Sequence, residues 1–160
     1  MRSCPLRLVA IVVTASSLGA AAGCGDDADG GPAPFPEDYR STYQEVRDCR
    51  FSLEHDLKYI RVLADPEAVE PYVDQFLPFP VGSILVKEQF GDADTSCETL
   101  VDFTVMVKLT LDAAPEDLDW SWYHVSGAFR IVREDVKGCP KCHIDCGFPP
   151  MGYDGTCTMP

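Results

Sequence analysis

Residues 83–90 read SILVKEQF and residues 102–111 read DFTVMVKLTL, and these two stretches decide the predicted fold. Both are rich in β-branched and apolar residues, which favour β-strands. Similar strand patterns occupy residues 57–63 (LKYIRVL), 120–125 (WSWYHV) and 128–132 (AFRIV). Because strands that are consecutive in a chain commonly lie side by side, the sequence predicts an antiparallel sheet.

Short helices are predicted around this sheet. Residues 37–49 show an amphipathic pattern, with apolar residues recurring at helical spacing. Asp65 and Pro66 form a typical helix start, and this second helix should end before Pro78. The predicted fold class is therefore α+β, with an antiparallel β-sheet core, a few short helices and a C-terminal segment rich in Cys, Gly and Pro.

The N-terminus has the layout of a bacterial export signal. Two arginines precede an apolar run over residues 8–15, and small residues then lead to Cys24. This order resembles a lipoprotein signal, in which residues 1–23 are removed and Cys24 receives a lipid; plain secretion is the alternative. We expect a protein of the bacterial cell envelope, in the periplasm or on the outer surface, anchored to a membrane by the lipid at Cys24.

Residues 24–36 are polar and rich in Gly, Pro and Asp, so we expect a flexible tether before a folded domain over residues 37–160. The formal net charge of −13 argues against a nucleic-acid partner, because phosphate binding requires a basic face. Loss of residues 1–23 removes two arginines and no acidic residue, which takes the net charge to −15. The acidic surface is either merely solvated or a docking face for a basic electron-transfer partner.

Residues 139–143 read CPKCH, which is the C-x-x-C-H pattern of c-type haem attachment. Cys139 and Cys142 are spaced to bond the two vinyl groups of haem, and His143 follows at the position that ligates the iron. We therefore expect residues 37–160 to form a haem c domain with a C-terminal attachment segment. The same pentapeptide is also compatible with a redox dithiol, or with half of a zinc site that no second C-x-x-C completes.

Eight cysteines in 160 residues indicate an oxidising compartment, a metal or covalent cofactor attachment. With one cysteine in the signal, one for the lipid and two for haem, Cys49, Cys97, Cys146 and Cys157 remain. Four cysteines allow three pairings. We favour Cys146 with Cys157, which closes the Gly- and Pro-rich tail, and Cys49 with Cys97.

Several motifs in a fixed order resemble the cytochrome P-460 family and the related c-prime-beta cytochromes, over about residues 59–143. They are YIRV with Asp-Pro at 59–66, FPVGSILVKE at 79–88, MVK at 106–108 followed by Trp120, and CPKCH at 139–143. The second is similar to the family's F-P-x-G-x-x-x-x-K-E segment. The resemblance implies an antiparallel-sheet fold, a homodimer and a five-coordinate c-type haem.

The resemblance also implies roles for individual residues. Lys87 matches a lysine that is cross-linked to the haem ring in the hydroxylamine-oxidising members, and Arg61 matches a pocket arginine that pairs with a propionate or an oxyanion. Thr104 stands where those enzymes carry a distal glutamate, and threonine does not accept a proton as a carboxylate does. Asp102, two residues earlier on the same strand face, is the expected substitute.

Three functions follow as expectations. The first is an enzyme that oxidises hydroxylamine or a related nitrogen compound at haem, with Lys87, Arg61 and Thr104 in its pocket. The second is a non-enzymatic electron-transfer or nitric-oxide-binding cytochrome, which Thr104 favours. The third is a disulfide-stabilised lipoprotein without haem. We expect His55 to be a local loop or helix-end residue, the alternative being a sixth iron ligand.

Overall fold

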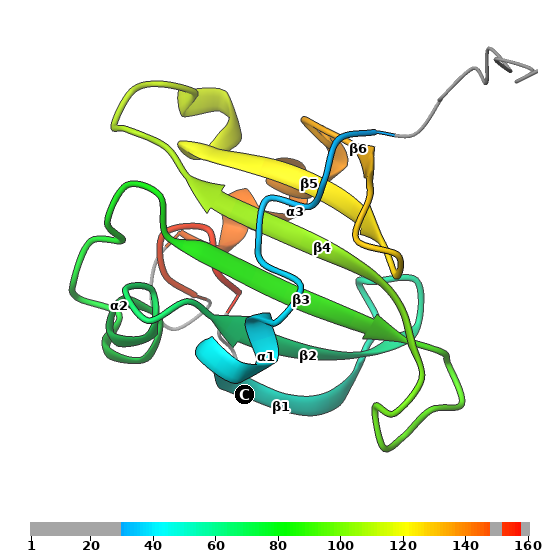
Figure 1. Ribbon diagram of the computed structural model, residues 1–160. Coiled ribbons are helices and arrows are strands. Elements are labelled where there is room, and N and C mark those ends of the chain that lie inside the picture. Colours follow the sequence, from blue (N-terminus) through cyan, green and yellow to red (C-terminus); the bar gives the residue numbers. More distant parts are fainter. Residues whose placement is uncertain (1–29, 148–151, 158–160) are drawn as a thin grey trace, which may run out of the picture.

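The computed structural model describes residues 30–147 and 152–157 (Figure 1). Six strands form one open antiparallel sheet, in which each strand pairs with the next one along the chain. The strands are β1 (Gln44–Ser52), β2 (Lys58–Ala64), β3 (Ile84–Phe90), β4 (Leu100–Lys108), β5 (Trp120–Ser126) and β6 (Ile131–Arg133). The strands expected at residues 57–63, 83–90, 102–111, 120–125 and 128–132 are thereby confirmed, with ends shifted by up to three residues.

The helices of the described chain are short. They are α1 (Tyr39–Thr42), α2 (Val69–Asp74), α3 (Gly138–His143) and the 3-10 turns η1 (Pro115–Asp117) and η2 (Ile144–Cys146). None of them is long enough to cover the sheet as a layer. The predicted α+β class is therefore corrected: the domain has a sheet-rich fold with short helices at its periphery.

The helix predicted over residues 37–49 is wrong beyond its first turn. Tyr43 already has extended backbone angles, and β1 then pairs with β2 from Gln44 onwards. A helix would have placed Tyr39 and Val46 on one face, whereas the two residues pack against different hydrophobic clusters. Strand pairing and burial on both sides of the sheet overrode the local helical pattern.

The start of the second helix is only partly as predicted. The carboxylate of Asp65 accepts hydrogen bonds from the backbone N–H groups of Glu67 and Ala68, at 2.9 and 2.8 Å. This is capping chemistry, but it closes a turn, and α2 itself begins at Val69 and ends before Pro78.

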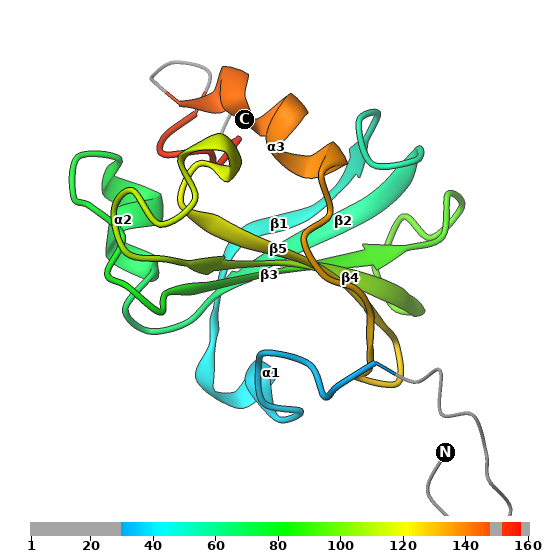
Figure 2. The same cartoon turned by 90° about the horizontal axis from the view of Figure 1, so that it is seen from above.

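The sheet is covered on both sides (Figure 2). Figure 2 shows α3 and residues 152–157 on one side, with α1 and residues 30–38 on the other. Alternate residues of strands β2 to β5 supply the two cores, as the period of two requires. One cluster contains Val62, Ala64, Ala68, Tyr72, Phe79, Leu85, Met106, Trp120 and Trp122, and the other contains Phe35, Tyr39, Leu63, Val86, Phe103, Val105 and Val125.

Residues 30–36 belong to the fold, although they were predicted as part of a flexible tether. Pro32 forms a β-bridge with Arg130, and Phe35 is 6% exposed and packs edge-on against Phe103. The export signal, Cys24 and the rest of the tether lie outside the described residues. Within residues 30–147 and 152–157, no helix has the length and apolar character needed to cross a membrane.

Two disulfides tie distant segments together, and they are the two pairings favoured from the sequence. Cys49 of β1 is bonded to Cys97 in the loop between β3 and β4, and Cys146 of η2 is bonded to Cys157 in the tail. Cys139 and Cys142 are free thiols.

A buried charge network lies on the α1 side of the sheet. Glu88 is fully buried, and its carboxylate accepts hydrogen bonds from the Tyr39 hydroxyl and from the guanidinium groups of Arg40 (2.7 Å) and Arg61 (2.6 Å). A buried carboxylate is tolerated only when such partners replace its hydration. The network therefore fixes α1 against β2 and β3.

Candidate functional site

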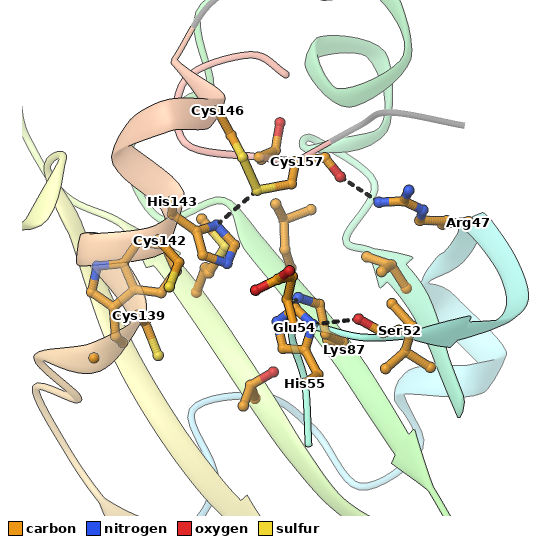
Figure 3. Close-up of a pocket in the computed structure, with 18 of the residues that line it drawn as sticks. Arg47, Ser52, Glu54, His55, Lys87, Cys139, Cys142, His143, Cys146 and Cys157 are labelled. Carbon is orange, nitrogen blue, oxygen red and sulfur yellow. Dashed lines mark hydrogen bonds between the residues drawn. A yellow bond between two sulfur atoms is a disulfide. The ribbon is translucent and has the colours of Figure 1, made fainter. Parts of the chain in front are cut away.

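A cavity of about 910 Å³ lies between the sheet and α3 (Figure 3). Its volume is within the range of pockets that hold cofactor-sized ligands. The sheet contributes apolar side chains to its wall, including Ile60, Val62, Leu85, Met106 and Trp122. Polar and charged groups reach it from β1, from the turn between β1 and β2, from β3, and from the C-terminal segment. A mostly apolar pocket with a few converging polar groups is the usual form of a binding site.

The C-x-x-C-H motif forms the body of α3. Residues at positions i, i+3 and i+4 share one face of a helix, so Cys139, Cys142 and His143 all line the same cavity. Burial raises the pKa of the Cys139 thiol, whereas Cys142 is exposed at the surface of the helix. Both thiols are therefore present, unbonded to each other, at one wall of the cavity.

His143 is buried, and its ring has a fixed orientation. Its Nδ1 lies 2.5 Å from the carbonyl oxygen of Gly155, and its ring centroid lies 4.8 Å from that of Trp122. Because a carbonyl oxygen only accepts, Nδ1 carries the proton and Nε2 keeps its lone pair. Burial, together with the nearby charge of Lys87, lowers the pKa of His143 to about 4. The imidazole is therefore neutral at pH 7, which is the state that binds metals.

The tail holds the Gly155 carbonyl in place through several contacts. The Cys146–Cys157 disulfide closes the segment, and the indole nitrogen of Trp120 donates to the backbone carbonyl of Asp154 at 2.9 Å. Gly155 has a φ of +78°, and an added Cβ would lie 3.0 Å from the Leu118 side chain. Glycine is thus favoured at the position whose carbonyl orients His143.

Lys87 and His55 meet inside the cavity. The Nζ of Lys87 lies 2.8 Å from Nε2 of His55, and Nδ1 of His55 lies 2.8 Å from the Ser52 hydroxyl oxygen. Burial, with the charge of Arg47, lowers the pKa of Lys87 to about 8. Burial and the charge of Lys87 likewise lower the pKa of His55 to about 3. His55 is therefore more than a local turn residue: its neutral ring lines the cavity and contacts Lys87 there.

Thr104 lines the cavity beside Lys87, its partner in the pairing of β3 and β4. Asp102, the expected substitute for a distal glutamate, is not among the cavity residues. It lies further along the same face, where its carboxylate contacts Lys58 at 3.1 Å and His124 at 3.2 Å.

Arg61 lies on the opposite side of the sheet from the cavity, in the network around Glu88. Its expected place in the pocket is therefore corrected. Val62, and not Arg61, is paired with Lys87 across β2 and β3, so Val62 shares the cavity face. The structure thus brings together Lys87, Thr104, Cys139, Cys142 and His143, and leaves Arg61 out.

Two arginines and three carboxylates of the cavity were not predicted from the sequence: Arg47, Arg50, Glu54, Asp56 and Asp145. Arg47 and Arg50 of β1 line it, and the Arg47 guanidinium donates to the Cys157 carbonyl. Glu54 also lines it, from the exposed turn between β1 and β2. Because residues 37–49 were interpreted as a helix, nothing in the pattern predicted which side chains of β1 would face the cavity.

No protein-family model and no curated protein matches this chain. Among the residues described by the structure, no three His, Cys, Asp or Glu side chains are grouped as ligands of a metal ion.

Proposed function

We propose that the protein is an exported c-type cytochrome, in which Cys139 and Cys142 bind haem covalently and His143 ligates the iron. One observation carries this proposal: the two free thiols and the neutral imidazole share one helix face at a cavity of about 910 Å³. The donor set fits the cofactor, since thioether formation needs free cysteines and iron ligation needs an unprotonated imidazole nitrogen. When bound, haem supplies one-electron redox chemistry and a metal centre for ligands.

The chain's own residues have distinct parts in this function. The apolar wall excludes water from the cofactor, and the Gly155 carbonyl keeps the proton of His143 on Nδ1. Such a hydrogen bond orients a ligating histidine and raises its basicity. Arg47 and Arg50 supply cationic side chains for the anionic groups of the cofactor, the part that the resemblance gave to Arg61.

Electron transfer, or the binding of a small ligand such as nitric oxide, suits this cavity better than oxidation of hydroxylamine. The carboxylates that line it, Glu54, Asp56 and Asp145, are all exposed residues. On the sheet, Thr104 offers a hydroxyl, which does not take up a proton near neutral pH. The net charge of −13 suits a basic redox partner.

Hydroxylamine oxidation is the second candidate, and the position of Lys87 favours it. Lys87 lies in the cavity, as the cross-linked lysine of the cytochrome P-460 family would. We expect the intact haem-loaded protein to have the mass of a chain with two covalent haem bonds, and not to reduce an electron acceptor when hydroxylamine is added. Hydroxylamine-dependent reduction that is lost in Lys87→Met would instead establish the enzyme.

The proposal is tested on the full chain, expressed with and without a c-type cytochrome maturation system. After denaturing electrophoresis, the chain matured with the system should retain haem, and the chain made without it should not. A colourless protein from the competent host would overturn the proposal. Membership of the cytochrome P-460 family, the lipid at Cys24 and a homodimer stay predictions.

The tail disulfide should tune the redox potential through His143. In Cys146→Ala/Cys157→Ala the Gly155 carbonyl loses its covalent restraint, and we expect the free energy of unfolding to fall by about 2–4 kcal/mol. We also expect the midpoint potential of this variant to rise. If His143 binds oxidised iron roughly tenfold more weakly in it, the rise is about 60 mV.

The matched control is Cys49→Ala/Cys97→Ala, because neither of these cysteines lines the cavity. This variant should also lose stability, but its midpoint potential should equal that of the wild type. Equal potentials in the two double variants would contradict a positioning role for the tail.

A further inference from the structure

His55 and His143 face one another across the cavity (Figure 3). Their ring centroids lie 6.3 Å apart, and the ring planes are inclined at 73°. An imidazole nitrogen binds a first-row metal at about 2.0–2.1 Å, so two rings that share one metal from opposite sides have centroids roughly 6 Å apart. The observed separation therefore matches two rings with space for one metal ion between them.

The hydrogen bonds of the two rings put both in the same tautomer. His143 donates from Nδ1 to the carbonyl of Gly155. The Lys87 side chain donates to Nε2 of His55, so the His55 proton is on Nδ1 and is donated to the Ser52 hydroxyl. Each ring thus has Nδ1 anchored by a protein oxygen and a lone pair on Nε2. A metal-ligating histidine commonly has this arrangement.

The turn that carries His55 has an unusual backbone. The two residues after His55, Asp56 and Leu57, have φ values of +54° and +58°, in the left-handed region that is rarely adopted by residues other than glycine. Leu57 is also exposed, so its burial does not explain this conformation. The turn brings the His55 side chain back over the sheet, to within hydrogen-bonding distance of Lys87.

From these contacts we infer that His55 is a second axial ligand of the haem iron, opposite His143. This inference rests on the proposed haem binding and makes the protein a six-coordinate bis-histidine cytochrome, not the five-coordinate one that the resemblance implies. Nε2 of His55 has a single lone pair, so binding to iron replaces the hydrogen bond that it accepts from Lys87. An external ligand must then displace His55, which favours electron transfer over ligand binding.

Absorption and electron paramagnetic resonance spectra of the full chain, matured with haem, test this inference. The oxidised wild type should be low-spin and six-coordinate, and His55→Ala should be high-spin with an open position. If His55 occupies the iron more than nine-tenths of the time, oxidised His55→Ala should bind added imidazole at least about tenfold more tightly than the wild type.

Two further variants sharpen the test. His124→Ala is the matched control, because His124 contacts Asp102 and does not line the cavity; its spectra should equal those of the wild type. His55→Met supplies a thioether, which also ligates haem iron, so it should stay low-spin with a higher midpoint potential. This variant also tests the inference if His55→Ala does not incorporate haem.

The possible failures are distinguishable. A wild type that carries covalent haem but is high-spin, with spectra unchanged in His55→Ala, would overturn the inference and leave haem binding intact. A low-spin spectrum that persists in His55→Ala would assign the sixth position to another side chain and also overturn it. A chain that takes up no covalent haem would overturn both this inference and the proposed function.

Discussion

Cys139→Ser/Cys142→Ser should lose all covalently bound haem, although the fold is retained. Both thiols line the cavity and neither is joined to another cysteine, so their replacement removes the two attachment points and no structural bridge. Cys142 is exposed and Cys139 is half-buried, and a serine of similar size fits either position. Haem staining after denaturing electrophoresis measures the loss, and circular dichroism checks the fold.

Lys141→Ala is the control for this experiment, because Lys141 lies between the two cysteines and is exposed. It should stain as strongly as the wild type. Staining of the double serine variant at the wild-type level would show that haem is not held by these two sulfurs, and the proposed function would be wrong.

Glu88→Ala should lower the free energy of unfolding by about 3–5 kcal/mol, the usual cost of removing one partner of a buried ion pair. Glu88 is 0% exposed and lies between Arg40 and Arg61, with the Tyr39 hydroxyl as a third partner. Without the carboxylate, the half-buried Arg61 guanidinium and the buried Tyr39 hydroxyl lose their common acceptor. Urea denaturation followed by tryptophan fluorescence measures the change.

Asp48→Ala is the matched control, since the Asp48 carboxylate is 71% exposed and its ion pair is with the neighbouring Arg50. Exposed pairs contribute little, so this variant should lose far less stability than Glu88→Ala. A loss in Glu88→Ala no larger than that in Asp48→Ala would mean that the network is not what holds α1 on the sheet.

The parts of the fold that could be predicted are those with a local cause. The β-branched and apolar residues of β3 and β4 define strands without knowledge of their neighbours. The helix predicted over residues 37–49 was wrong for the opposite reason. Their helical pattern is genuine, but an isolated helix of this length is only marginally stable in water, and β1 instead pairs with β2 and packs Val46 against the core of the sheet.

The candidate site could likewise be predicted only in part. The C-x-x-C-H spacing puts Cys139, Cys142 and His143 on one face of any helix, because three and four residues are about one turn, but only the structure shows that this segment is helical. Arg61 was placed wrongly because one step along a strand exchanges the two faces of a sheet, and only the pairing of Val62 with Lys87 decides between them.

Local residue patterns were thus enough for five of the six strands, but not for β1, and the two disulfides were favoured among three possible pairings. Three features depended on segments that lie far apart in the chain. They are the Gly155 carbonyl behind His143, Arg47 in the cavity and His55 opposite His143. Each depends on how a turn or the tail packs over the sheet. Sequence spacing does not predict such contacts, because the long loops that join these segments allow many arrangements.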